Sequence, residues 1–308
     1  MLPEPFLIDE VIPVAEEKVG LAVLGQPINH SISPILHHAA LKELLIKEAP
    51  FSDWHYDRID IHPDQLHAGL EKLKNCGYKG LNLTIPHKEE VLSVINHVDA
   101  EAEVIGAVNT LLLKSNEWIG FNTDGYGIFR AVQEKLNYRI KDASVLLLGA
   151  GGAARAACVK FLMEGCSELK VLNRSEERMN NLVNSLKIRF NSTKISGTTY
   201  EKFKADDFLD KDWLVVNATS IGLDENDLSP LPFSCSILGS GSAVYDMIYN
   251  PVQTKLLKDA EESNLRNANG LSMLVFQAAK ALEIWTEREV STEAMFLAAY
   301  QYLNIKCS

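Results

Sequence analysis

The sequence lacks a long apolar run and a recognisable targeting segment. No stretch approaches the roughly 18 consecutive apolar residues that a membrane-spanning helix needs, so no membrane association is expected. The first 18 residues are acidic and carry neither an arginine-rich pattern nor a signal-peptide pattern. They are therefore interpreted as an N-terminal extension, residues 1–18, on a cytoplasmic protein.

Paired cysteines and metal-binding spacings are also missing. All eight histidines fall between His30 and His97 without an H-E-x-x-H pattern, and no zinc-type spacing occurs, so no metal site is predicted. The cysteines are odd in number and include no C-x-x-C pair, which favours reduced thiols over a disulfide framework. The five cysteines are Cys76, Cys158, Cys166, Cys235 and Cys307.

An excess of basic residues is the third absence. The chain has 30 Lys and Arg against 41 Asp and Glu, which gives a formal net charge of -11. A general nucleic-acid binder needs a basic face, so no nucleic-acid partner is expected. Hydrophobic residues make up 46% and charged residues 23% of the 308 residues, so the chain can bury a core. Its length suits two domains of ordinary size.

The most informative stretch that is present begins at Ser144 and reads SVLLLGAGGAARAACVKF. Its apolar start predicts a buried strand, and its alanine-rich end predicts a helix. Between them Gly149, Gly151 and Ala154 form a G-x-G-x-x-A pattern, which between a strand and a helix is typical of a dinucleotide-binding turn. The free N–H groups of the helix N-terminus would hold the pyrophosphate. The alternative is a glycine-rich turn that binds no ligand.

The end of the next expected strand indicates which dinucleotide is bound. A site for NAD usually has Asp or Glu there, to hold the ribose 2′-hydroxyl. Here the residues are Asn173-Arg174-Ser175, and Arg178 follows one helical turn later. A guanidinium is the natural partner of a 2′-phosphate, so the sequence predicts NADP. The alternative is that the two arginines form ordinary surface ion pairs with neighbouring glutamates.

Alternating strand and helix patterns predict an α/β fold. The first half of the chain is expected to form a largely parallel α/β layer. A second α/β unit starts at Ser144, and residues 243–247 are expected to be its last strand.

Two serines stand at the start of an expected helix in the first half. Ser33 precedes Pro34 and suits the helix N-cap. Ser31 and Ser33 together would also suit a bound carboxylate, because hydroxyl groups and a helix N-terminus both favour an anion. Both interpretations stay open at this point.

Lys88 and Asp124 are candidate functional residues for a different reason. Lys88 falls in the first turn of a helix expected over residues 89–96, where the positive end of the helix dipole disfavours an ammonium group. A role in function competes there with a solvated surface lysine. Asp124 precedes a helix expected over residues 126–136 and is either its cap or a functional carboxylate.

Taken in order, these motifs resemble those of the shikimate dehydrogenase family, including its quinate/shikimate dehydrogenase relatives. The resemblance extends from about Val19 to beyond Gln277, and so many ordered motifs at compatible spacing make it specific. The residues that carry it in the first half are His30-Ser31-Ile32-Ser33-Pro34, Asn82-Leu83-Thr84-Ile85-Pro86-His87-Lys88, Gly106-Ala107-Val108-Asn109-Thr110 and Asn122-Thr123-Asp124-Gly125. Those in the second half are the turn at 149–154, Asn173-Arg174-Ser175, Asn217-Ala218-Thr219-Ser220, Tyr245-Asp246-Met247-Ile248-Tyr249 and the run GLSMLVFQ at 270–277.

The resemblance implies a reaction and roles for individual residues. It implies reversible, NADPH-dependent reduction of 3-dehydroshikimate to shikimate, in chorismate and aromatic amino-acid biosynthesis. Lys88 and Asp124 would be the catalytic pair. The implied substrate-binding residues are Ser31, Ser33, Asn82, Thr84, Asn109, Tyr249 and Gln277. The implied cofactor-binding residues are Gly149, Ala150, Gly151, Gly152, Ala153, Asn173, Arg174, Ser175, Arg178, Thr219, Met247, Gly270 and Met273.

The family also implies a split domain organisation. Residues 19–123 and 270–308 would form an α/β substrate-binding catalytic domain, and residues 124–269 an inserted Rossmann-type NADP-binding domain, with the active site in the cleft between them. The chain departs from the family at Ile32 and at Ser272, which replaces a frequent glycine beside the nicotinamide; neither implies a different reaction. The alternatives are a quinate/shikimate dehydrogenase that uses NAD or NADP, and a non-catalytic metabolite sensor on the same fold. A homodimer stays open.

Overall fold

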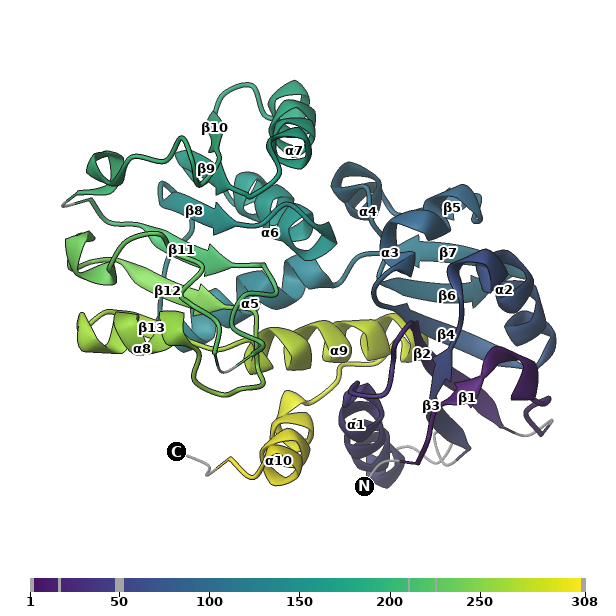
Figure 1. The fold of residues 1–308 in the computed structure, drawn as a ribbon. Coiled ribbons are helices and arrows are strands. Elements are labelled where there is room, and N and C mark those ends of the chain that lie inside the picture. The colour runs from purple at the N-terminus through teal and green to yellow at the C-terminus, as the bar shows by residue number, and fades with distance from the viewer. Residues whose placement is uncertain (1–2, 16–17, 48–52, 210, 225, 306–308) are drawn as a thin grey trace. The chain divides into compact units, whose positions relative to one another are not determined.

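The computed structural model describes residues 3–15, 18–47, 53–209, 211–224 and 226–305. The chain divides into two compact units. Unit 1 comprises Met1–Thr123 and Val275–Ser308, and unit 2 comprises Asp124–Leu274. Each unit has its own sheet (Figure 1). The fold is therefore of the mixed α/β class that the sequence predicts.

The sheet of unit 1 has seven strands in the order β1-β3-β2-β4-β6-β7-β5. The strands are β1 (Phe6–Leu7), β2 (Val19–Gly25), β3 (Trp54–Asp60), β4 (Tyr78–Leu83), β5 (His97–Val98), β6 (Thr110–Lys114) and β7 (Glu117–Phe121). The first four strands of this order are parallel, but β6 runs antiparallel to both β4 and β7. The expectation of a largely parallel layer is therefore confirmed, with β6 as the antiparallel strand. Ser115 and Asn116 both have positive φ, which makes the tight hairpin turn between β6 and β7.

Helices cover this sheet, and the core lies beneath them. The α-helices are α1 (Ser33–Lys47), α2 (Leu66–Asn75), α3 (His87–Glu90), α4 (Ala100–Ile105), α10 (Thr292–Leu303) and the later part of α9 (Leu271–Thr286). The 3-10 helices are η1 (Ile8–Glu10), η3 (Pro63–Gln65) and η4 (Val91–Ser93). Apolar residues of α2 pack with those of β4 in one buried cluster. Trp285, fully buried, donates its indole N–H to the carbonyl of Leu111 at 2.9 Å.

The N-terminal segment, residues 3–15, packs on unit 1. Its strand β1 pairs in parallel with β3. Ile8 and Val11 are buried in the same apolar cluster as α2. The segment that sequence patterns indicate only as an extension therefore contributes side chains to the core.

The sheet of unit 2 is fully parallel and has the order β10-β9-β8-β11-β12-β13. Its strands are β8 (Ser144–Leu148), β9 (Glu168–Leu172), β10 (Lys194–Thr198), β11 (Leu214–Asn217), β12 (Ala243–Asp246) and β13 (Arg266–Ala268). Numbered from β8, this is the 3-2-1-4-5-6 order of dinucleotide-binding folds. The expectation that the strand at 243–247 is the last one is wrong, because β13 adds a further strand beside β12.

Within its described residues, unit 2 has four α-helices besides the first residues of α9. They are α5 (Asp124–Leu136), α6 (Gly152–Met163), α7 (Glu176–Arg189) and α8 (Lys255–Glu262), with the 3-10 helices η5 (Ala205–Phe208) and η6 (Cys235–Ile237). Helix α7 packs on β9 and β10, and α8 packs on β12 and β13 (Figure 1). Four aliphatic residues of β8 are completely buried, as its apolar sequence predicts.

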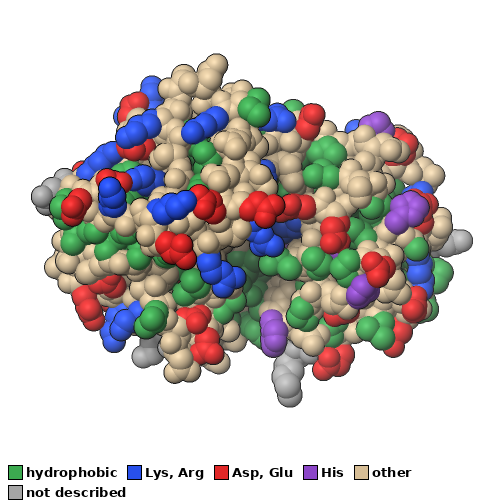
Figure 2. All heavy atoms as spheres, turned by 45° about the horizontal axis from the view of Figure 1, so that its top comes forward, with side chains coloured by type: hydrophobic (Ala, Val, Ile, Leu, Met, Phe, Trp, Pro, Cys, Tyr) green, Lys and Arg blue, Asp and Glu red, His purple; other side chains and the backbone are tan. Residues whose placement is uncertain are grey.

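The surface carries charged side chains of both signs. On the face that Figure 2 shows, acidic and basic side chains are interspersed.

Across the part of the chain that the structure describes, no helix is long and apolar enough to cross a membrane. In the same residues no group of His, Cys, Asp and Glu side chains is arranged to hold a metal ion. Cys76, Cys158, Cys166 and Cys235 are buried free thiols, and Cys307 lies outside the described residues.

A buried histidine should make the stability of the protein depend on pH. The ring of His37 in α1 is fully buried and stacks on Tyr56, with 4.1 Å between the ring centroids. Burial, assisted by His38, lowers the pKa of His37 from 6.5 to about 3. The folded protein therefore keeps this ring neutral at a pH where the unfolded chain protonates it. Its contribution to stability is present above about pH 6.5 and is lost as the pH falls from there toward 3.

We predict that His37→Phe reduces this loss, because phenylalanine keeps the stacked ring and cannot be protonated. Between about pH 7 and about pH 5, the free energy of unfolding of the wild type should fall by about 2 kcal/mol more than that of the variant. Urea denaturation of both proteins at the two pH values measures the difference. An equal fall in both proteins would contradict the neutral state of His37.

Candidate active site

Buried polar side chains gather at one end of β4 and β6 in unit 1. Asn82, at the end of β4, donates to the carbonyl of Asn109 and to the hydroxyl of Thr110, both at 3.1 Å. The hydroxyl of Tyr56 donates to Oδ1 of Asn82 at 2.7 Å. Asn82 and Asn109 are 6% and 2% exposed, so their amides are fixed by partners and not by solvent.

Asn109 extends this cluster to two other segments of unit 1. Its Oδ1 accepts from the main-chain N–H of Thr123 at 2.8 Å, and its Nδ2 donates to the Thr123 hydroxyl at 3.0 Å. The same Nδ2 lies 3.5 Å from Oε1 of Gln277 in α9. The structure thus brings together Asn82, Asn109 and Gln277, three of the residues predicted to bind substrate.

The two serines lie in the turn between β2 and α1. Ser31 Oγ donates to Ser33 Oγ at 3.2 Å and also accepts from the N–H of Ser33 at 3.4 Å. Helix α1 begins at Ser33, and the carbonyl of Ile32 accepts from the N–H of Leu36. The prediction that Ser33 is the helix cap is therefore wrong by one residue, because the carbonyl of Ile32 accepts the first helical hydrogen bond. The two hydroxyl groups stay together at the helix N-terminus, where an anion is favoured.

Thr84 and Lys88 follow β4 in the chain. Thr84 is half-buried, and its carbonyl accepts from the N–H of His87. Lys88 is half-buried in α3, and its carbonyl accepts from the N–H of Val108 at 2.8 Å. The backbone of Lys88 is thereby tied to the residue that precedes Asn109. The helix expected over residues 89–96 is wrong, since α3 ends at Glu90 and a 3-10 helix follows. Four residues align few peptide dipoles, so the dipole argument for Lys88 is weaker than the sequence suggests.

Asp124 is the first residue of α5 and of unit 2, and it is 5% exposed. The helix begins two residues earlier than expected, so Asp124 lies within its first turn instead of before it. A carboxylate in the first turn of a helix is favoured by the unpaired N–H groups there.

The glycine-rich turn of unit 2 follows β8 at the point where the strand order reverses. Gly149 has φ of +111°, and a Cβ on it would come within 2.9 Å of the Ala218 carbonyl oxygen. Gly151 is the N-cap of α6, and no side chain caps this helix. A Cβ built on Gly151 meets no atom within 4 Å, so there is open space beside this residue at the start of the helix. This turn fits a dinucleotide pyrophosphate, which would lie against the helix N-terminus.

The neighbouring predicted cofactor residues in the turn differ in exposure. Gly152 and Ala153 form the first turn of α6, and they and Ala150 are half-buried. Ala154 is completely buried, as close packing of the helix on the sheet requires.

The arginines follow β9 at the same edge of the sheet. Arg174 and Arg178 are both exposed. The Ser175 hydroxyl accepts from the N–H of Arg178 as the N-cap of α7, and Asn173 Nδ2 donates to the Ser175 carbonyl at 2.9 Å. Asn173 and Ser175 therefore shape the turn that carries the two guanidinium groups.

A buried carboxylate holds polar side chains in place at the ends of the strands on the other side of β8. Asp246 and Asn217 are fully buried at the ends of β12 and β11, and Asn217 Nδ2 donates to Asp246 at 2.9 Å. Asn217 Oδ1 in turn accepts from the hydroxyl of Thr219 at 2.7 Å. The other Asp246 oxygen accepts from the hydroxyl of Thr254 at 2.7 Å. Burial raises the pKa of Asp246, and these hydrogen bonds oppose the rise. Thr219 is held in place by this pair.

The remaining predicted residues of unit 2 lie around the start of α9. A Cβ on Gly270 would overlap the carbonyl oxygen of Met247 at 1.9 Å, so only glycine fits there. The fully buried Tyr245 accepts from the N–H of Met273 at 3.0 Å and is hydrogen-bonded to Ser272 at 2.9 Å. Ser272, the departure noted above, thus has a partner inside unit 2. Tyr249 is half-buried after β12.

Three positioning residues escaped the sequence analysis. Tyr56 holds Asn82, Thr123 holds Asn109, and Asp246 holds Asn217. Thr123 and Asp246 stand within the quoted motifs, which was a usable signal. Tyr56 has no such signal, because only the pairing of β2 with both β3 and β4 brings it near Asn82.

Comparisons with known proteins show which family the chain resembles over nearly its whole length. Three family models match the chain: shikimate dehydrogenase substrate binding domain over residues 23–111, shikimate / quinate 5-dehydrogenase over residues 130–206, and shikimate 5′-dehydrogenase C-terminal domain over residues 270–295. Curated relatives include the shikimate dehydrogenase (NADP(+)) of Methanopyrus kandleri, which is 35% identical over 297 residues covering 95% of this chain and 99% of that one. The enzyme of the same name from Methanocaldococcus jannaschii is 36% identical, covering 91% and 95%.

A solved structure gives the same result at the level of the fold. The shikimate 5-dehydrogenase of Thermus thermophilus, crystallised with NADP(H) and shikimate, has a TM-score of 0.78 and 31% identity, covering 92% of this chain and 99% of that one. Similarity of sequence and of structure thus extends over nearly the whole chain. On these grounds the chain belongs to the shikimate dehydrogenase family.

Proposed function

We propose that this protein is an NADP-dependent shikimate dehydrogenase, which reversibly reduces 3-dehydroshikimate to shikimate. The observation that carries the proposal is the cluster of Asn82, Asn109 and Gln277, held by buried hydrogen bonds in a chain whose relatives are NADP-dependent shikimate dehydrogenases. A polyhydroxy acid needs several fixed polar partners to be distinguished from its analogues. Ser31, Ser33 and Tyr249 are assigned to its carboxylate, and Asn82, Thr84, Asn109 and Gln277 to its ring hydroxyl groups.

The division of the chain follows from the same proposal. Residues 19–123 and 270–308 are assigned to substrate binding and residues 124–269 to NADP binding. The open space beside Gly151 and the lack of a side-chain cap on α6 support the second assignment, because they let a pyrophosphate approach the backbone at the start of this helix. Arg174 and Arg178 are assigned to the 2′-phosphate, and Thr219, Met247, Gly270 and Met273 complete the cofactor site.

Lys88 and Asp124 are assigned to the proton transfer. When bound, NADPH supplies the hydride for the carbonyl carbon of the substrate. Lys88 donates a proton to the carbonyl oxygen as negative charge develops there, and it takes the proton back in the oxidation direction. Asp124 orients the reacting hydroxyl group by accepting its hydrogen bond.

The competing interpretation is a quinate/shikimate dehydrogenase that also uses NAD. The two arginines after β9 favour NADP, because no carboxylate in Asn173-Arg174-Ser175 is present to bind a ribose 2′-hydroxyl. Initial rates with both substrates and both cofactors decide between them. A higher kcat/KM with NAD than with NADP would contradict our choice.

We predict that Lys88→Ala abolishes most turnover without abolishing substrate binding. Loss of a general acid/base should lower kcat by about 10²- to 10⁴-fold, while the dissociation constant of shikimate changes little. Steady-state rates of shikimate oxidation and calorimetric titration with shikimate measure the two effects. Lys74→Ala is the matched control, since Lys74 pairs with Glu71 within α2 and is not among the predicted site residues, and its kcat should equal that of the wild type. A Lys88→Ala variant with wild-type kcat would refute the assigned acid/base.

We predict that Arg174→Ala and Arg178→Ala each weaken the use of NADP selectively. Removing a charge-assisted hydrogen bond to the 2′-phosphate should raise the KM for NADP by about 10-fold or more. The low activity with NAD should not change, because NAD has no 2′-phosphate. The control is Arg189→Ala at the exposed end of α7, which should leave both KM values unchanged. An equal loss with NAD and NADP would mean that the arginines support the fold and not the phosphate.

A further inference from the structure

Ser31 is the last residue of a tight turn that precedes α1. The N–H of Ser31 donates to the carbonyl of Ile28 at 3.1 Å, which makes residues 28–31 a four-residue turn. In such a turn the carbonyl between the second and third residues belongs to Asn29. Rotation of that peptide interconverts the common turn types, so a hydrogen-bond partner on this carbonyl selects one type for the turn that precedes Ser33.

Arg58 fixes this peptide. It lies on β3, it is 6% exposed, and one of its guanidinium nitrogens donates to the carbonyl of Asn29. Asn29 is two residues from Ser31, so their Cα atoms are at most about 7 Å apart. Among the described residues Arg58 has no carboxylate partner within salt-bridge distance. A buried cation without a counterion is costly, so its main-chain acceptors carry unusual weight.

The second acceptor of Arg58 is in the N-terminal segment. Its other terminal nitrogen donates to the carbonyl of Pro3. One guanidinium therefore joins the start of the chain to the turn before α1. Arg58 and Asp57 are consecutive residues of β3, so their side chains point to opposite faces of the sheet. The segment therefore passes from one face to the other around the edge strand β1.

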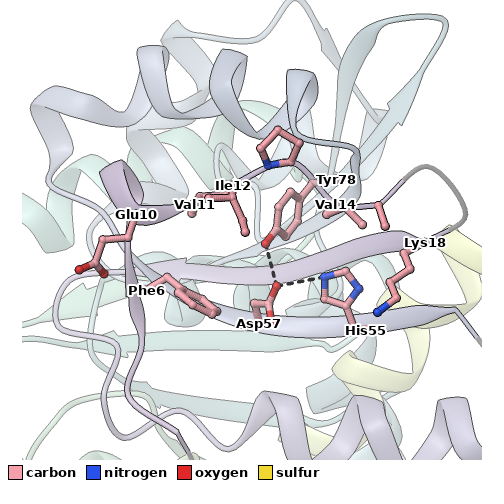
Figure 3. A pocket seen from close by; sticks show the side chains of 11 residues that line it. Phe6, Glu10, Val11, Ile12, Val14, Lys18, His55, Asp57 and Tyr78 are labelled. Atoms are coloured by element: carbon pink, nitrogen blue, oxygen red, sulfur yellow. Dashed lines mark hydrogen bonds and ion pairs between the residues drawn. The ribbon is translucent and has the colours of Figure 1, made fainter.

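On the Asp57 face the segment is only partly packed. A cavity of about 430 Å³ lies between the segment and the strands β3 and β4. Figure 3 shows residues that line it, among them Phe6, Ile12 and Val14 of the segment and Asp57 and Tyr78 of the two strands. The Tyr78 hydroxyl donates to Asp57 at 2.7 Å, a bond between strands that does not hold the segment. Separate contacts hold the segment instead. Ile8 and Val11 are buried in the core, the N–H of Val14 donates to the carbonyl of Cys76, and Lys72 donates to the carbonyl of Asp9.

We propose that Arg58 is a positioning residue for the carboxylate subsite and that the N-terminal segment supports it through the carbonyl of Pro3. The inference rests on the proposed function, in which Ser31 and Ser33 bind the substrate carboxylate. Arg58 does not touch the substrate; it sets the turn that presents the two hydroxyl groups. The first residues of the chain are then part of the substrate half of the enzyme.

Three variants test the proposal in the full-length enzyme. Arg58→Met frees the Asn29 peptide and should raise the KM for shikimate, and its calorimetric dissociation constant, by about 10-fold. Its kcat and its KM for NADP should stay within about two-fold of the wild type. Arg58→Lys keeps the charge but cannot span two carbonyls, so it should recover only part of the loss. A chain that begins at Pro5 behind an initiating Met lacks the Pro3 carbonyl but keeps Ile8 and Val11, and it should show a smaller rise in the KM for shikimate.

Lys72→Met is the control, because it removes an attachment of the segment that does not reach the turn. Its KM for shikimate should equal that of the wild type. A merely structural role for Arg58 would lower the unfolding temperature and the active fraction, and hence the apparent kcat, without moving KM; that result overturns the proposal. A wild-type KM in Arg58→Lys overturns the two-carbonyl geometry, and a wild-type KM in the shortened chain overturns the role of the segment. If the wild-type protein itself does not bind shikimate, the proposed function fails and this inference fails with it; unmoved variants of an active wild type refute this inference alone.

Discussion

The hydrogen bonds of the Asn109 side-chain amide are the interaction on which the polar cluster of unit 1 depends. The amide binds the main chain and the hydroxyl of Thr123, and the main-chain carbonyl of Asn109 accepts from Asn82 and from the N–H of Leu83. One residue thereby joins the ends of β4 and β7 to the segment before β6. An amide buried at 2% exposure that lost these partners would leave polar atoms without hydrogen bonds, which costs about 1–3 kcal/mol for each group. The polar surface offered to a ligand is therefore rigid before any ligand arrives.

Unit 2 solves the same problem with a charged group. Asp246 is fully buried, and among the described residues it has neutral partners: the amide of Asn217, the hydroxyl of Thr254 and the N–H of Ile248. Burial without a cation raises its pKa, and the three hydrogen bonds favour its ionised form. The consequence is geometric. The ends of β11 and β12 are locked together at the carboxyl edge of a parallel sheet, where ligands bind in this fold. Loops that begin at Thr219 and Met247 then start from fixed points.

Local patterns were sufficient to predict the parts of the site that one segment builds. The turn at Gly149–Gly151 and the start of α6 need only a strand, three small residues and a helix, all adjacent in sequence. The prediction failed where a distant segment decides. β13 is three residues long and polar, and it exists because β12 offers an open edge. The error at Ser33 is of another kind, a local shift of one residue, because the Ile32 carbonyl starts the helix. Tyr56 joins the polar cluster only through the pairing of β2 with β3 and β4.

The role of the N-terminal segment shows why such failures concentrate in one kind of place. Its sequence has few helix or strand patterns, so those patterns indicate only an extension of the chain. Its proposed contribution to the carboxylate subsite lies in one main-chain carbonyl, that of Pro3, and side-chain patterns carry no information on where a main-chain carbonyl lies. What can be recognised from the sequence is the partner: an arginine amid a strand that must be buried. A buried guanidinium requires acceptors, and when no carboxylate is at hand the backbone has to supply them. The buried arginine thus predicts that some segment must come to it, and the fold determines which one does.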